Sequence, residues 1–148
     1  MQPAAPPEIF WFIPSGGDGR LLGAATRRNR FAYLTAVAQA ADSLGFDGVL
    51  LPTGGVNEDT VVVASALASL TRRLRFLVAV RPGLLSPILA ARITASLDRI
   101  SEGRANLNVV TGSGRFDFEG LTISHAQRYE LTREWLVAYR GAFGDDPV

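Results

Sequence analysis

The chain has 148 residues, of which 47% are hydrophobic and 20% charged, a balance typical of one soluble folded domain. Lysine and arginine together number 15 against 14 acidic residues, so no strong electrostatic field attracts nucleic acid or an anionic membrane. Cysteine is absent and His125 is the only histidine, which excludes disulfides and thiolate zinc sites and predicts no metal centre. Neither a membrane-spanning apolar run nor a signal-peptide pattern is present, so we expect a cytoplasmic protein.

The first half of the chain predicts two strand and helix units behind a short leader. Residues 1–8 are rich in proline and alanine, and we expect a disordered arm because proline fixes φ and donates no ladder hydrogen bond. Short apolar runs at residues 9–13 and 48–52 predict buried strands. Apolar residues three or four apart predict a helix over residues 31–44, and a second helix over residues 57–73 ends in two arginines that suit its negative terminus.

The second half predicts two further units of the same kind. An apolar run over residues 74–80 indicates a third strand. A capping serine followed by proline opens a third helix over residues 86–103, and a glycine closes it. Residues 105–111 predict a fourth strand, and a last helix is expected over residues 124–143.

Four strand and helix units in strict alternation predict an α/β protein with a parallel sheet covered by helices. Two architectures share this pattern: an open doubly wound sheet, complete at about this length, and a (β/α)8 TIM barrel, which needs roughly 250 residues. A dinucleotide-binding loop is not predicted, because the glycine-rich stretch after the first strand is not followed directly by a helix. The pattern itself leaves both architectures open.

Specific blocks of the sequence favour the barrel. Five of them are Phe10-Trp-Phe-Ile-Pro-Ser-Gly-Gly-Asp-Gly19, Gly48-Val-Leu-Leu-Pro-Thr-Gly54, Glu58-Asp59, Arg75-Phe-Leu-Val-Ala-Val-Arg-Pro-Gly83 and Ser86-Pro87. In order and spacing these blocks resemble the N-terminal half of the alkanesulfonate monooxygenases.

Three later blocks resemble a signature of the wider bacterial-luciferase-like, flavin-dependent monooxygenases. They are Leu97-Asp-Arg-Ile-Ser-Glu-Gly-Arg104, Asn108-Val-Val-Thr-Gly112 and His125-Ala-Gln-Arg-Tyr129. The resemblance covers nearly the whole chain after the leader. It implies that residues 9–148 form the N-terminal half of a (β/α)8 TIM barrel, with only the first four β/α units of the barrel present.

The resemblance also implies an activity. Members of this family bind reduced FMN (FMNH2) delivered by a separate NAD(P)H-dependent flavin reductase and use O2 to oxygenate a small organic substrate. For an alkanesulfonate the products are an aldehyde and sulfite. Two alternatives stay open: a non-catalytic flavin-binding remnant or subunit, and a related luciferase-like monooxygenase with another small organic substrate.

Four residues are candidates for holding the flavin, because barrel enzymes bind ligands at the carboxyl ends of their strands. Asn108 resembles a family asparagine beside the flavin, although a structural hydrogen bond inside the barrel is the alternative. His125 and Tyr129 are four apart on one helix face and match the family's flavin-phosphate pair, although a cap and a core residue are the alternatives. Thr53 lies where the family lines its flavin pocket, or serves as a turn residue before Gly54. No catalytic residue is assigned.

Further side chains are predicted with plainer roles. Trp11 and Phe12 alternate along the first strand, and we expect core packing for both. Arg81 attracts an anionic ligand or is a solvated residue at a strand end. Gly16 and Asn57 depart from the histidine and cysteine of many sulfonate enzymes, which leaves the exact substrate open.

Half of a barrel has physical consequences that we also expect here. Four strands that do not close leave two free edges and an uncovered apolar face, which favours association. We therefore expect a homo-oligomer, or a marginally stable fragment with little turnover alone.

Overall fold

The computed structural model describes residues 5–16, 31–54, 57–112 and 123–144, and within them strands and helices alternate. The elements are β1 (Phe10–Phe12), α2 (Phe31–Leu44), β2 (Gly48–Leu51), α3 (Thr60–Ala68), β3 (Arg75–Val80), α4 (Pro87–Ile100), β4 (Ala105–Val109) and α5 (His125–Gly141). The predicted α/β class and the alternation of strands and helices are therefore confirmed. The glycine-rich stretch after β1 lies largely outside the described residues.

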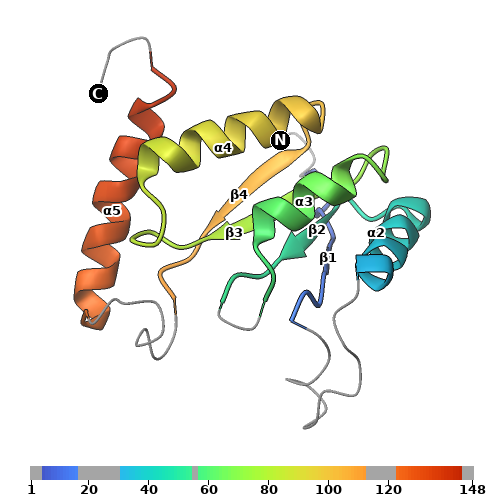
Figure 1. The fold of residues 1–148 in the computed structure, drawn as a ribbon, viewed down its shortest axis with the longest axis horizontal. Coiled ribbons are helices and arrows are strands. Elements are labelled where there is room, and N and C mark those ends of the chain that lie inside the picture. The colour runs from blue at the N-terminus through green and yellow to red at the C-terminus, as the bar shows by residue number, and fades with distance from the viewer. Residues whose placement is uncertain (1–4, 17–30, 55–56, 113–122, 145–148) are drawn as a thin grey trace, which may run out of the picture.

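The four strands form one parallel sheet in the order β1-β2-β3-β4. Figure 1 shows α3 and α4 lying across one face of this sheet, with α2 on the β1 side and α5 on the β4 side. Sequential strands that pair in order, each joined to the next through a helix, are the construction of a barrel wall, whereas a doubly wound sheet reverses its strand order part-way. The sheet is consistent with part of a luciferase-like barrel.

The main core lies between the sheet and the helices that cover it. Alternate strand residues point to the same face, so Val49 and Leu51 of β2 and Phe76 and Val78 of β3 all meet the helices. All four are fully buried. The helix side chains buried in the same cluster include Leu34, Ala38, Ala64, Leu67 and Leu97.

Helix ends follow the predicted chemistry in most places. Gly45 and Gly103 end two helices in left-handed backbone, with φ of +85° and +81°. Ser86 caps α4 by accepting a hydrogen bond from the Leu89 N–H, with Pro87 at the first helical position.

Among the described residues, no helix is both long and apolar enough to cross a membrane.

The second predicted helix is shorter than expected, because α3 ends at Ala68 rather than at Arg73. Arg72 and Arg73 follow the helix, and their backbone N–H groups donate to the two carboxylate oxygens of Asp42 at 2.9 and 3.1 Å. Partial burial opposes ionisation of Asp42, but these backbone hydrogen bonds outweigh it and lower the pKa of the carboxyl below its ordinary value. A tertiary contact from α2 therefore replaces the last turn predicted for the helix.

The prediction of core packing for Trp11 and Phe12 is wrong in this structure. Their side chains are 51% and 49% exposed. β1 is an edge strand, which among the described strands pairs with β2 alone. The described residues therefore cover neither of these two side chains completely. Trp11 retains one aromatic partner, Phe46, in an edge-on contact with ring centroids 5.4 Å apart.

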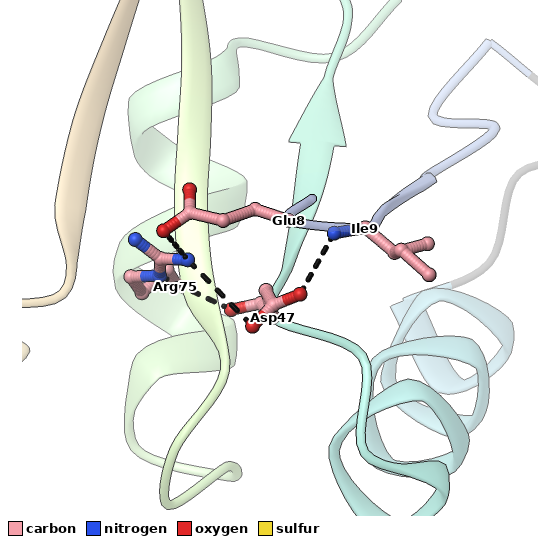
Figure 2. A network of polar contacts seen from close by, with 4 residues as sticks. All are labelled: Glu8, Ile9, Asp47 and Arg75. Carbon is pink, nitrogen blue, oxygen red and sulfur yellow. Dashed lines mark hydrogen bonds and ion pairs between the residues drawn. The ribbon is translucent and has the colours of Figure 1, made fainter. Parts of the chain in front are cut away.

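A polar network holds together the amino ends of three strands (Figure 2). The Asp47 carboxylate accepts a hydrogen bond from the Ile9 N–H at 2.7 Å. The Arg75 guanidinium lies 2.9 Å from the Glu8 carboxylate and 3.9 Å from that of Asp47, and it also covers the Phe10 ring. Residues 1–4 of the predicted leader lie outside the described residues, whereas Glu8 takes part in this network.

Candidate functional site

A hollow of about 590 Å³ opens at the carboxyl ends of the strands. Its wall is built from the ends of β2, β3 and β4 and from α5. The lining residues are Leu50, Pro52, Thr53, Ala79, Arg81, Asn108, Val109, Val110, Thr111, Gly112 and Tyr129. The carboxyl ends of parallel strands are where α/β proteins bind ligands, and this volume lies within the usual range for small-molecule sites.

Three of the four predicted site residues meet in this hollow. Thr53 reaches it from the end of β2, Asn108 from β4 and Tyr129 from α5. The fourth, His125, is not part of the lining, but its ring centroid lies 4.9 Å from that of Tyr129. The structure therefore brings together side chains that are far apart in the sequence, while their role in binding a flavin stays a prediction.

The register of the sheet explains why Asn108 faces the hollow. Asn108 pairs with Ala79 across β3 and β4, and both side chains line the wall. Arg81 lies two residues beyond Ala79, so its side chain points to the same face of the sheet and also lines the hollow. The Val110 N–H donates to the Val80 carbonyl at 2.9 Å, which keeps the two chains paired up to the rim of the hollow.

The amino end of α5 supplies the other side of the hollow. Ser124 and Gln127 form a reciprocal capping box, in which each side chain accepts a hydrogen bond from the other residue's backbone N–H. This cap defines where the helix begins and so places His125 and Tyr129 one turn apart on the same face. The Tyr129 side chain is 55% exposed and remains accessible to a ligand.

Most of the lining was not predicted as site residues, and Thr111, Gly112 and Arg81 are the polar or conformationally special members of this group. Thr111 and Gly112 continue the chain beyond β4, and Gly112 has left-handed backbone with φ of +81°. Their signal was present in the Asn108-Val-Val-Thr-Gly112 block, of which only the asparagine was selected. Arg81, for which two roles were left open, also lines the hollow. Among the described residues that line the hollow, Arg81 is the one ionic side chain.

Gly16 and Asn57, the two departures from the sulfonate enzymes, do not line the hollow. Asn57 instead meets the turn after β1, where its Oδ1 atom lies 3.4 Å from the Oγ of Ser15, a buried residue. The same residue bends the chain after β2, because the Asn57 N–H donates to the Gly54 carbonyl at 2.9 Å. The contacts described for Asn57 therefore shape loops rather than the wall of the hollow.

A parallel sheet with a ligand-sized hollow at the carboxyl ends of its strands is typical of α/β proteins that bind small molecules. The chain belongs to the luciferase-like monooxygenase family, whose model matches residues 8–148.

Solved structures of monooxygenases share the fold. An EDTA monooxygenase from Chelativorans sp. BNC1 has a TM-score of 0.77 at 22% identity, over 95% of this chain and 41% of that chain. A monooxygenase from Streptomyces bottropensis has a TM-score of 0.77 at 25% identity, over 96% of this chain and 44% of the other. The oxygenating constituent of 3,6-diketocamphane monooxygenase from Pseudomonas putida, solved with FMN, has a TM-score of 0.73 at 21% identity, over 95% and 40%. The chain spans less than half the length of these structures.

Proposed function

We propose that this chain forms the flavin-binding wall of an FMNH2-dependent monooxygenase. The substrate that we propose for this enzyme is an alkanesulfonate, which it converts to an aldehyde and sulfite. The observation that carries the proposal is the convergence of Thr53, Asn108 and Tyr129 on one hollow. A separate NAD(P)H-dependent flavin reductase supplies the reduced flavin, and O2 is the co-substrate.

The residues of the hollow fit FMN in chemical character. Leu50, Ala79 and Val109 offer an apolar surface for the ring system, and the Asn108 amide both donates and accepts hydrogen bonds at its edge. Thr53 offers a hydroxyl to a flavin carbonyl. His125 and Tyr129 lie together at the amino end of α5, where they would hold the phosphate of FMN. Bound reduced FMN supplies the electrons that activate O2, while the protein orients the cofactor and limits the access of water.

The sulfonate substrate rests on the resemblance of the blocks that begin at Phe10, Gly48 and Arg75. Arg81 in the lining is compatible with an anionic head group, since a guanidinium binds oxyanions through paired hydrogen bonds. A related monooxygenase with a different small organic substrate is the second candidate. It is favoured by Gly16 and Asn57, which replace the histidine and cysteine of many sulfonate enzymes.

FMN titration of the 148-residue chain, followed by quenching of flavin fluorescence, tests the cofactor site. We expect saturable binding that Asn108→Ala weakens about tenfold, as expected for loss of hydrogen bonds to a bound ligand. Asn106→Ala is the matched control, because Asn106 lies in the same strand but outside the lining of the hollow. Absence of FMN binding, or equal weakening by both substitutions, contradicts the proposed site.

Substrate turnover separates the candidates for function. Sulfite release from a simple alkanesulfonate, with FMNH2 and O2 supplied, supports the sulfonate enzyme. Saturable FMN binding without turnover of any tested substrate supports a flavin-binding remnant or subunit.

We also propose that the sheet associates with a second copy of the chain. Among the described strands, β1 and β4 are the edges of the sheet, and the large side chains of Trp11 and Phe12 on β1 are half exposed. Size-exclusion chromatography with light scattering measures the mass in solution, and a monodisperse monomer contradicts this association.

A further inference from the structure

The last helix, α5, carries the two predicted phosphate-binding residues, and most of its residues are exposed or only partly buried. Of its 17 residues, Trp135 is the buried one, with 4% of its side chain exposed. Other apolar residues of α5 face outward, including Val137 at 66% exposed. Leu136 and Tyr139 are partly buried against the same cluster as Trp135, so the position of α5 relative to the sheet depends chiefly on how this cluster holds Trp135.

Trp135 is held by both packing and a hydrogen bond. Its indole Nε1–H donates to the Leu85 carbonyl at 2.8 Å, in the connection between β3 and α4. Its ring packs in a small core cluster with Val80 and Ala90, against which Val109 also packs. A buried indole that satisfies its one donor has a single defined position, because turning the ring leaves the N–H without a partner.

This cluster lies directly behind the hollow. Val109 belongs both to the cluster and to the lining, and Val80 precedes the lining residue Arg81. Tyr129 is six residues before Trp135 on the same helix, about 9 Å along the axis at 1.5 Å per residue. A rigid helix of this length transmits a shift at Trp135 to Tyr129, whereas Asn108 stays fixed in the sheet.

We propose that Trp135 is a positioning residue for the cofactor site: it sets the distance between the phosphate-binding pair, His125 and Tyr129, and the part of the wall formed by Asn108. The inference rests on the proposed function, since it assumes that FMN spans the hollow from α5 to β4. Trp135 itself does not line the hollow.

A double-mutant cycle tests the inference, with the dissociation constant of FMN as the measured quantity. Tyr129→Phe removes one hydroxyl from the hollow, and Trp135→Phe removes the indole N–H but keeps an aromatic ring. Substitutions this far apart without shared contacts normally have additive effects. We expect each single variant to weaken FMN binding about fivefold, and the double variant to be no weaker than either one. The Tyr129 hydroxyl can contribute only when α5 is correctly placed.

Trp11→Phe is the matched control, because Trp11 is the other tryptophan and packs against Phe46 beside β1, whereas Trp135 packs near β4 at the opposite end of the strand order. It is expected to leave FMN binding within twofold of wild type and to combine additively with Tyr129→Phe. Urea unfolding of every variant accompanies the titrations. If Trp135→Phe fails to fold, Trp135 is replaced by benzothienylalanine, which lacks the indole N–H but has nearly the same ring shape. The Trp11→Phe background ensures that Trp135 is the one tryptophan replaced.

Additive effects of Tyr129→Phe and Trp135→Phe overturn the positioning role, even when wild type binds FMN. Unchanged FMN affinity in Trp135→Phe overturns it as well. Wild type that fails to bind FMN overturns the proposed function and this inference together, so the two failures are distinguishable.

Discussion

Arg104 is the residue whose replacement we expect to destabilise the domain most clearly. It follows α4 and sends its guanidinium back under the ends of three elements. The Nε–H donates to the Ser101 carbonyl at 2.6 Å, Nη1 to the Leu74 carbonyl at 3.1 Å and Nη2 to the Ala68 carbonyl at 2.9 Å. Nη1 also donates to the Thr71 hydroxyl at 3.1 Å, and the guanidinium lies 5.4 Å from the centroid of the Phe76 ring.

The magnitude follows from what Arg104→Ala removes. A hydrogen bond from a charged donor contributes about 1.5–3 kcal/mol net when it is buried. These four bonds are only partly buried, so water replaces some of them, and we expect a total loss of about 3 kcal/mol. That is a large share of the roughly 5–15 kcal/mol that stabilises a typical domain. Arg104→Lys should still cost about 2 kcal/mol, because an ammonium lacks the planar fork of donors.

Urea unfolding followed by circular dichroism at 222 nm measures this loss as a lower midpoint at constant slope. Arg92→Ala is the control, since it removes the same charge from an exposed position on α4 and is expected to change stability by less than about 0.5 kcal/mol. If the free energy of unfolding of Arg104→Ala lies within about 1 kcal/mol of the wild-type value, the hydrogen bonds from Arg104 to the Ala68 and Leu74 carbonyls contribute little to stability. The structural reasoning would then be refuted.

Two further predictions concern Asp42 and Gly48. Because folding lowers the pKa of Asp42, its stabilising effect is present above the unfolded pKa of about 3.9 and is lost as the pH falls through the lower folded value. Asp42→Asn should therefore lower the urea midpoint at pH 7 and lower it less at pH 3; an equal loss at both pH values contradicts this origin. A Cβ at Gly48 would lie 2.4 Å from Phe10 Cε1 and 2.6 Å from the Arg75 carbonyl oxygen, so Gly48→Ala should cost about 2 kcal/mol in thermal unfolding. An unchanged melting temperature would show that β1 and β3 move apart to accommodate the added methyl group at little cost, and would contradict this prediction.

Much of the local structure could be predicted from particular residues. Ser86 followed by Pro87 indicated the start of α4, and Gly45 indicated the end of α2, because their backbone preferences act over a few residues. The family blocks selected Asn108 and Tyr129, which the structure brings to one hollow. The same local reasoning placed the end of α3 five residues too late, because the Asp42 carboxylate that binds the backbone of Arg72 comes from another helix.

The amino-acid sequence by itself determined the alternation of strands and helices, since hydrophobic periodicity and capping residues act within a single element. Only the tertiary structure decided which strand side chains are covered, and it left Trp11 half exposed at a sheet edge. It also decided that Arg81 and Thr111 share a wall with Thr53, and that Trp135 anchors the helix of Tyr129. These relations depend on strand register and on contacts between residues far apart in the chain, and no local preference encodes the distance between them.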